Sequence, residues 1–231
     1  MNKKQNSYLK NFTFVVAVRK GSQRIKDKNI RKFGNSSLLE IKLKQIRRIY
    51  KKANILLSTD CGKSLKLGKK YNTILDNREK KYCSNNIPMP KVYQYLAKKV
   101  KTKFVCYLHV TSPFLKDSTL LDALKKFANK NRRYDSVATV TTLKEYLWRK
   151  KKAINYNPNK HPRSQDLEGL MALNFAINIV STKFMKNKGR IVGKHFIPVN
   201  LNFPENIDID DKWQFIIGDL IEKKKLDLRK L

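Results

Sequence analysis

The sequence has few of the residues that build redox, metal and membrane sites. Its three cysteines, Cys61, Cys83 and Cys106, are widely spaced and form no C-x-x-C pair, which argues against a disulfide framework or a cysteine zinc site. The apolar run at residues 12–18 is too short to cross a bilayer, and no secretory apolar region precedes it. We therefore expect a cytoplasmic protein with reduced thiols and no membrane partner.

Acidic residues are also scarce, because 18 Asp and Glu stand against 52 Lys and Arg, giving a formal net charge of +34. One explanation is a non-catalytic nucleic-acid-binding protein, since Lys and Arg neutralise phosphates. The other is codon bias in an AT-rich genome, which enriches lysine wherever the fold tolerates it. The lysines occur in every segment and do not alternate with aromatic residues, as a base-stacking surface requires. We favour the second explanation, in which the charge still steers anionic substrates to the protein.

Two common phosphate-binding motifs are missing. Gly62-Lys63-Ser64 resembles the end of a P-loop, but Leu57 stands where that motif needs glycine. No G-x-G-x-x-G follows an apolar run, which removes the main argument for a dinucleotide cofactor.

Hydrophobic residues make up 41% of the 231 positions, enough for a single α/β domain with a substantial core. Short β-branched runs alternate with amphipathic stretches, which predicts a Rossmann-like, mostly parallel sheet with helices on both faces. The predicted strands cover residues 12–18, 54–58, 73–75, 104–110, 136–141 and 172–180, and the predicted helices cover residues 36–50, 60–71, 88–100, 117–129 and 211–225. The alternation stops between residues 143 and 170, and we interpret this basic, turn-rich stretch as a small insertion.

The segment after the first predicted strand has the composition of a phosphate-binding loop. Arg19, Arg24 and Lys28 supply cations, Gly21 allows a tight turn, and Ser22 adds a hydroxyl. Ligands of open α/β sheets bind beyond the carboxyl ends of the strands, where this loop is expected. Such a loop suits a triphosphate. A solvated loop explains its composition equally well, because basic loops abound in so basic a chain.

Asp208 and Asp210 lie two positions apart near the predicted final helix. Alternate residues of an extended segment face the same way, so both carboxylates are expected on one side, with Ile207 and Ile209 packed inward. Mg²⁺ favours one or two carboxylates together with substrate phosphates. The other interpretation is a helix N-cap formed by Asp210 or Asp211, and capping by Asp211 is compatible with metal binding by the other two.

Six segments, in order, resemble motifs of the acylneuraminate cytidylyltransferases, a family that includes enzymes for other nonulosonic acids. They are V-R-K-G-S-Q-R-I-K-D-K-N at residues 18–29, S-T-D at 58–60, N-R-E at 77–79, T-S-P-F at 111–114, P-R-S-Q-D-L at 162–167 and D-I-D at 208–210. The resemblance implies a fold of the nucleotide-diphosphosugar transferase type, a homodimer and Mg²⁺. It also implies transfer of CMP from CTP to the anomeric hydroxyl of an acidic sugar, with release of pyrophosphate.

The same resemblance implies roles for individual residues. Catalysis is expected from Arg19, Lys28 and Asp210, and the metal ligands are expected to be Asp208 and Asp210. The expected nucleotide contacts are Arg19, Gly21, Ser22, Lys28, Asn29, Arg78 and Ser84. The expected sugar contacts, some of them on the insertion that would also serve dimerisation, are His109, Thr111, Ser112, Arg163, Gln165 and Asn174.

The sequence departs from the family pattern at two positions near the expected sugar pocket. His109 stands where glutamine or proline is usual, and Phe175 replaces the glycine of an N-G-A-I-Y-like strand. Phe175 is expected to crowd the sugar pocket or change its preference. The alternative acceptor is 3-deoxy-manno-octulosonate, a shorter acidic sugar whose enzymes have a similar opening motif, although the segment with Arg163, Gln165 and Asp166 favours the nonulosonic acids.

Overall fold

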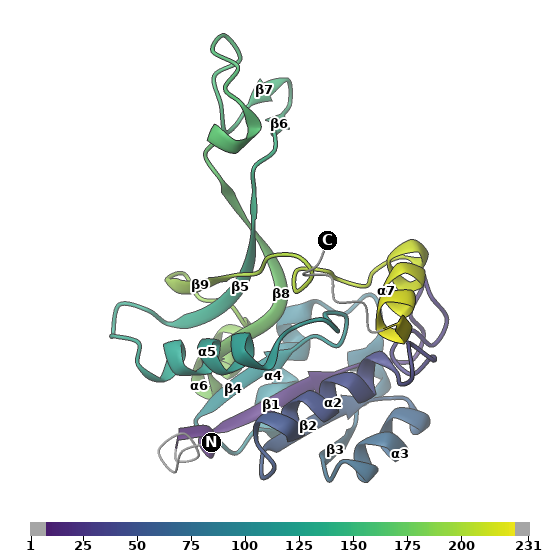
Figure 1. The fold of residues 1–231 in the computed structure, drawn as a ribbon. Helices are drawn as coiled ribbons and strands as arrows, with labels where there is room; N and C mark the ends of the chain where they lie inside the picture. Colours follow the sequence, from purple (N-terminus) through teal and green to yellow (C-terminus); the bar gives the residue numbers. More distant parts are fainter. Residues whose placement is uncertain (1–7, 225–231) are drawn as a thin grey trace.

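A seven-stranded mixed sheet forms the centre of the molecule (Figure 1), in a computed structural model that describes residues 8–224. Its strands are β1 (Phe12–Ala17), β2 (Asn54–Thr59), β3 (Ile74–Asn77), β4 (Phe104–Leu108), β5 (Ser136–Leu143), β8 (Leu170–Ser181) and β9 (Phe196–Asn200). They are arranged in the order β3-β2-β1-β4-β8-β5-β9. All neighbours pair in parallel except β8, which is antiparallel to both β4 and β5. The predicted α/β fold with a mostly parallel sheet is confirmed.

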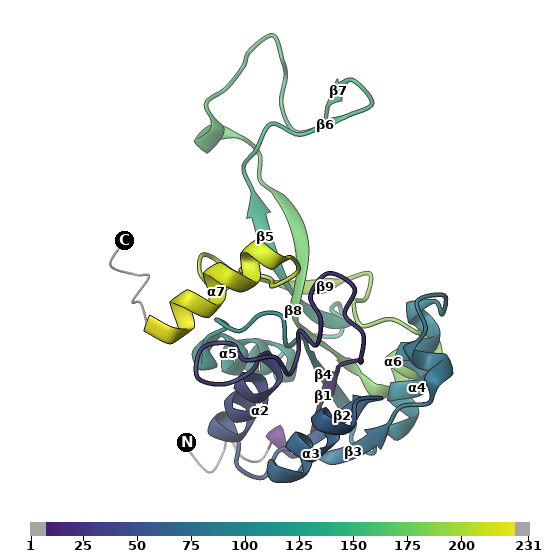
Figure 2. The same cartoon turned by 90° about the vertical axis from the view of Figure 1, so that its right-hand side faces the viewer.

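Helices cover both faces of this sheet (Figure 2). They are α2 (Leu38–Ile49), α3 (Gly62–Lys70), α4 (Met89–Lys99), α5 (Asp117–Ala128), α6 (Thr182–Lys188) and α7 (Lys212–Lys224). Alternate residues of β1 enter separate cores, as the period-2 geometry of a strand requires. Phe14 and Val16 pack in the larger core with α2, α5 and α7, whereas Val15 packs in the second core with α4 and α6.

Some elements of the structure were not predicted from the sequence, and the bounds of others differ from the predicted ones. Strand β9 contains Pro198 and lies at the edge of the sheet, and the seven-residue α6 is too short to show a helical period. The helix predicted for residues 211–225 is α7, although Lys225 lies outside the described residues. No helix among residues 8–224 is long and apolar enough to span a membrane.

An arm stands away from the sheet between β5 and β8 (Figures 1 and 2). It comprises residues 144–169, in the stretch where the sequence predicts an insertion, and includes the short strands β6 (Trp148–Arg149) and β7 (Lys152–Ala153) and the 3₁₀ helix η2 (Ser164–Asp166). Its two legs remain paired down to the sheet, beginning with Leu143 opposite Leu170. Aromatic rings pack against one another within the arm, with ring centroids 5.0 Å apart for Tyr146 and Tyr156.

Candidate active site

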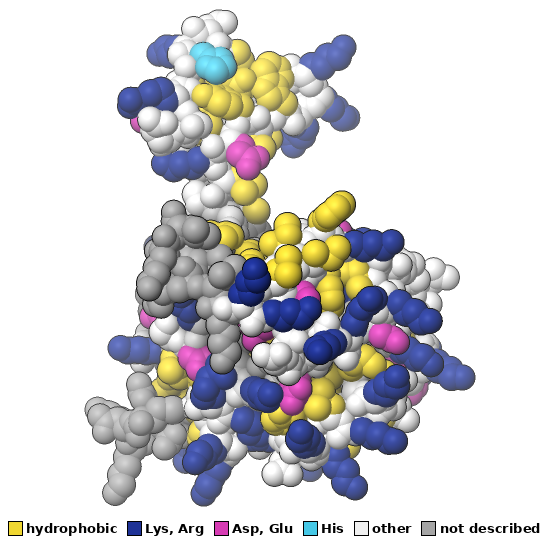
Figure 3. Space-filling model, turned by 45° about the vertical axis from the view of Figure 1, so that its right-hand side comes forward, with side chains coloured by type: hydrophobic (Ala, Val, Ile, Leu, Met, Phe, Trp, Pro, Cys, Tyr) yellow, Lys and Arg dark blue, Asp and Glu magenta, His cyan; other side chains and the backbone are white. Residues whose placement is uncertain are grey.

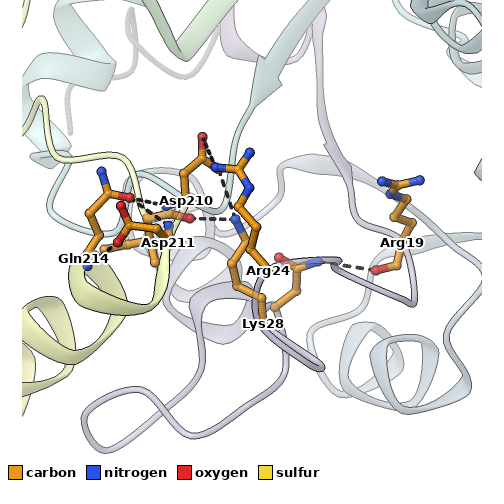
Figure 4. Close-up of polar contacts among 8 residues, drawn as sticks. Arg19, Arg24, Lys28, Asp210, Asp211 and Gln214 are labelled. Atoms are coloured by element: carbon orange, nitrogen blue, oxygen red, sulfur yellow. Dashed lines mark hydrogen bonds and ion pairs between the residues drawn. The ribbon is translucent and has the colours of Figure 1, made fainter. Parts of the chain in front are cut away.

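The loop after β1 meets the segment before α7 at the carboxyl end of the sheet (Figure 4). The Lys28 ammonium donates to the Ile209 carbonyl over 2.6 Å and to Asp210 Oδ1 over 3.2 Å. Arg24 lies on the other carboxylate oxygen, with Nη1 3.8 Å from Asp210 Oδ2. Lys28 is buried, so its ammonium is held in one place and its charge is weakly screened by solvent. Two predicted catalytic residues are therefore in direct contact although 182 positions separate them.

A polar cavity of about 220 Å³ opens beside this contact. It is lined by Arg19, Ser22, Gln23, Arg24, Lys28, Asn29 and Asp210. The loop holds its course partly because Asn29 Nδ2 donates to the Arg19 carbonyl over 3.5 Å. Gly21 adopts a φ of 79° with open space where a Cβ would lie, so glycine is needed there for backbone conformation. Three cations facing one small cavity suit a polyphosphate anion.

A second cavity, of about 340 Å³, adjoins the first at Arg19. Its lining includes Ala17, Arg19, Arg78, Tyr82, Cys83, Ser84, Asn85, Ile87, Met89, Val92, Tyr107 and His109. The apolar and aromatic walls, with a few polar groups among them, suit a planar base. Tyr82 and Asn85 were not among the predicted site residues. The sequence indicates them only by their position in the loop after the third predicted strand.

Arg78 joins the ends of β1 and β2 at the floor of the second cavity. The buried guanidinium donates to the Val18 carbonyl, and to the carbonyl and hydroxyl of Ser58. Arg19 Nη1 donates to the Cys83 carbonyl over 3.2 Å and also contacts Asn85 Oδ1. The two arginines thereby tie the sheet edge to the loop around the 3₁₀ helix η1 (Lys80–Cys83).

His109 is a neutral side chain in the wall of the second cavity. Its ring packs between Tyr107 and Phe175, at centroid distances of 5.2 and 6.0 Å. Burial, reinforced by the nearby Lys42 cation, lowers the pKa of His109 to about 4. Its Nε2 is buried and has no hydrogen-bond partner in the structure. A neutral imidazole with an unused ring nitrogen is equipped to bind a polar ligand group.

Asp208 provides the strongest indication of a metal ligand. Its Oδ1 is buried without a hydrogen-bond partner, and burial raises the pKa of its carboxyl group. The Ile209 N–H donates to the Thr111 carbonyl over 2.8 Å, which holds the segment against the turn after β4. Ile209 itself is fully buried, as predicted. Residues 8–224 contain no cluster of three or more His, Cys, Asp or Glu ligands, so a cation here would need phosphate oxygens to complete its shell.

The structure does not bring the remaining predicted sugar contacts together within one chain. Ser112 is buried, and Asn174 donates to the Thr141 hydroxyl over 3.0 Å. Arg163 and Gln165 lie on the arm, away from the loop of residues 19–29. The exposed Arg163 side chain pairs with Asp166 over 2.7 Å. In this single chain, the arm residues are therefore separate from the two cavities.

Comparisons with solved structures show a shared fold at low sequence identity. CMP:2-keto-3-deoxy-manno-octonic acid synthetase complexed with CTP matches with a TM-score of 0.66 and 11% identity, over 94% of this chain and 100% of that chain. The 4-diphosphocytidyl-2C-methyl-D-erythritol synthase from Anaerococcus prevotii matches with a TM-score of 0.59 and 12% identity, over 93% and 98% of the two chains. A cytidylyltransferase from Leptospira borgpetersenii matches with a TM-score of 0.53 and 14% identity, over 93% and 72%.

Sequence comparison identifies the family. No curated protein sequence matches the chain, but the sequence model of the cytidylyltransferase family matches residues 13–173. That match takes in the basic loop after β1, both arginines at the second cavity and the whole arm. The chain therefore belongs to the cytidylyltransferase family.

Proposed function

We propose that this cytidylyltransferase transfers CMP from CTP to the anomeric hydroxyl of a nonulosonic acid and releases pyrophosphate. The observation that carries the proposal is the meeting of Arg24, Lys28 and Asp210 in one polar cavity that shares Arg19 with a base-sized second cavity. A nucleotide with its phosphates in the first cavity and its base in the second would lie across Arg19. The six ordered motifs of the acylneuraminate cytidylyltransferases support the nonulosonic acid as acceptor.

The residues of the first cavity suit in-line displacement at the α-phosphorus. The sugar hydroxyl gives up its proton to solvent as its oxygen forms the new P–O bond and the bond to pyrophosphate breaks, and negative charge spreads over the phosphoryl oxygens. Arg19, Arg24 and Lys28 would stabilise that charge. Since the Ile209 carbonyl already fixes the Lys28 ammonium, little reorganisation is needed during the reaction.

Asp208 and Asp210 would hold the Mg²⁺ ion in this reaction. The unpartnered Asp208 oxygen and the nearby Asp210 carboxylate, whose charge acts on Asp208, support this assignment. When bound, Mg²⁺ supplies positive charge to the phosphate oxygens. The Lys28 ammonium donates to Asp210 Oδ1 over 3.2 Å and so helps to hold this carboxylate in place.

We further propose that the protein acts as a homodimer in which the arm completes the sugar site of a second copy. Arg163 and Gln165 are separate from the cavities of their own chain, while Arg163 is exposed and its guanidinium suits a bidentate pair with a sugar carboxylate. Tyr146 and Trp148 leave apolar surface exposed on the same arm. Such a surface suits contact with another protein.

A second acceptor, 3-deoxy-manno-octulosonate, also has specific support. The synthetase for that sugar is similar in fold over its whole length, and the opening motif is shared. Both acceptors are acidic sugars, so both would use the same arginine chemistry. Substrate assays distinguish them.

The test is pyrophosphate release from CTP and Mg²⁺ with a panel of nonulosonic acids, 3-deoxy-manno-octulosonate and 2C-methyl-D-erythritol 4-phosphate. We expect release that needs both CTP and an acidic sugar, and that falls by at least about 100-fold in Asp210→Ala. Asp211→Ala is the matched control, because the Asp211 carboxylate is adjacent in sequence but caps α7. If no sugar elicits release while nucleic acid binds tightly at moderate salt, the protein is a nucleic-acid-binding protein and the proposal is wrong.

A further inference from the structure

Lys42 is a fully buried lysine in the middle of α2, with 0% of its surface exposed. Its ammonium donates to Gln45 Oε1 over 2.8 Å and to the Ser112 carbonyl over 3.1 Å. Both acceptors are neutral. A lysine is almost never fully buried without a charged partner, so this position requires an explanation.

Gln45 lies one helical turn further along α2 and binds the same part of the chain. Its Nε2 donates to the Leu115 carbonyl over 2.6 Å and to Asp117 Oδ1 over 3.2 Å. Residues three apart on a helix share a face, so the two side chains reach out side by side. We call Lys42 and Gln45 the α2 clamp. The α2 clamp donates to two backbone carbonyls of the turn after β4, those of Ser112 and Leu115.

The turn that the α2 clamp holds also supports the segment that carries Asp208 and Asp210. The Thr111 carbonyl, next to Ser112, accepts the Ile209 N–H over 2.8 Å. The Ile209 carbonyl accepts the Lys28 ammonium over 2.6 Å. Asp208 and Asp210 flank Ile209, so the α2 clamp is joined to both proposed metal ligands through one turn and one backbone hydrogen bond.

The energetics favour a role in positioning over one in stability. Burying an ammonium costs free energy that an apolar side chain of similar length would not incur. A satisfied buried polar network makes a local arrangement unique instead. Either the ammonium or the neutral amine can serve both acceptors, since even the amine has two N–H groups.

We propose that Lys42, together with Gln45, is a positioning residue that fixes the turn of residues 111–115 and thereby the directions of Asp208 and Asp210. It does not touch substrate in this assignment. The functional part of this inference rests on the proposed cytidylyl transfer, whereas the structural part does not. The two parts are tested by separate measurements.

Lys42→Met is compared with Lys44→Met, which removes the same group from the half-exposed side of the same helix. Hydrogen exchange on the whole protein, without substrate, reports the backbone N–H of Ile209. We expect at least about tenfold faster exchange there in Lys42→Met and wild-type exchange in Lys44→Met. Protection of the β1 and β4 amides shows that the variant remains folded. Should it fail to fold, Gln45→Leu is measured in its place.

The second measurement is turnover as a function of Mg²⁺ concentration. We expect Lys42→Met to need several-fold more Mg²⁺ for half-maximal rate and to lose about tenfold in kcat, with a smaller change in the KM for CTP. Unchanged exchange at Ile209 overturns the clamp. Faster exchange with unchanged Mg²⁺ dependence overturns its role in positioning the carboxylates. If the wild type itself shows no turnover, the proposed function fails, and the exchange result alone decides whether the clamp exists.

Discussion

Phe175 has a backbone φ of 60°, in the left-handed region where a bulky residue is a clear outlier. The position lies in β8 where pairing with β5 shifts register, between the Asn178 and Leu173 pairs. The Asn178 side chain donates to the Phe175 carbonyl over 2.9 Å, which helps to hold this conformation. Strain of this kind concentrates at functional sites, and here the ring lies against His109 in the wall of the second cavity.

Phe175→Gly should therefore relieve backbone strain while removing a half-exposed ring. We expect it to reduce the free energy of unfolding by about 1 kcal/mol less than Leu173→Gly, a similarly exposed position on the same strand. Urea unfolding of both variants measures the difference. An equal or larger loss in Phe175→Gly would contradict the strain argument. In the pyrophosphate assay, the glycine variant should also accept sugars with bulkier acyl groups.

Lys42 should make stability depend on pH. Burial lowers the pKa of Lys42 from 10.5 to about 7, so between these values the unfolded chain holds a proton that the folded protein has released. The free energy of unfolding contributed by this group therefore rises with pH across that window. Lys42→Met lacks this titrating group. As pH rises from 7 to 10, its free energy of unfolding relative to that of the wild type should therefore fall by roughly a few kcal/mol.

The measurement is urea unfolding of wild type, Lys42→Met and Lys44→Met at pH 6.5 and 9.5. The nearby Asp117 and Arg48 charges and the Cys106 thiol are present in all three proteins, so the comparison isolates the substituted lysine. A stability difference that is the same at both pH values would show that Lys42 titrates normally.

At the scale of elements, the start of α7 lies directly beside the proposed metal ligands. Asp211 Oδ1 accepts the Gln214 N–H over 2.8 Å, and Gln214 Oε1 accepts the N–H groups of Asp210 and Asp211 over 2.7 and 2.9 Å. This reciprocal cap satisfies donors that the first helical turn leaves free. It also fixes the backbone of Asp210.

Asp211→Ala should cost about 1 kcal/mol of stability through loss of the cap. We expect it to retain most of the cytidylyl transfer rate, because Gln214 still holds the Asp210 amide. Thermal unfolding and the pyrophosphate assay give the two quantities. If Asp211→Ala lost activity to the same extent as Asp210→Ala, the division between cap and metal ligand would be wrong.

Sequence periodicity predicted most elements because the buried strands and amphipathic helices carry strong local signals. Residues 12–18 and 104–110 are mostly apolar, and within them β1 and β4 form at the centre of the sheet. Ser37 caps α2 by accepting the Glu40 N–H over 3.2 Å, at the start of the helix predicted for residues 36–50. β9 was not predicted, because an edge strand tolerates proline and polar residues, which weaken the alternating pattern of its sequence.

The site was only partly predictable, because its contacts are non-local. Composition and motif order placed Lys28 and Asp210 at one edge of the sheet, but only the fold shows that they touch. Lys42 has the composition of a surface residue, and no local pattern indicates a fully buried ammonium. The positive φ of Phe175 has one signal, the glycine that the resembled family has at this position, because the local pattern of this chain is that of an ordinary strand.

At the scale of the whole molecule, the positive charge is widely distributed. Lys and Arg side chains are scattered over the face shown in Figure 3, interspersed with acidic and apolar groups. Nucleic-acid grooves instead gather cations in a stripe or funnel. A second feature of this face is a gathering of hydrophobic side chains over α7, which exposes Trp213, Ile216 and Ile217.

The proposed homodimer predicts complementation between two inactive variants. Arg163→Ala would damage the sugar site of the other copy, whereas Asp210→Ala would damage the site of its own chain. A mixed dimer would then contain one site with both residues intact. We expect mixing under exchange conditions to restore up to about one quarter of wild-type transfer, because half of the dimers are mixed and each has one intact site.

Co-expression with two affinity tags isolates the mixed dimer for the pyrophosphate assay. Lys28→Ala paired with Asp210→Ala is the control for nonspecific recovery, because both changes damage the site of their own chain and the mixed dimer then has no intact site. Purified mixed dimers without activity would indicate that Arg163 acts within its own chain. A monomer in sedimentation would exclude the arrangement.

The legs of the arm, β5 and β8, are neighbouring strands that are both paired on their two sides, and their pairing with each other continues from the core out to Leu143 and Leu170. The stem therefore has no free hinge where it leaves the domain, and its entropy is lost when the chain folds. A second copy that docks on the arm would meet a preorganised surface and would lose little further freedom. In the proposed homodimer, this preorganisation favours tighter association, which is expected to appear mainly as a slower dissociation rate.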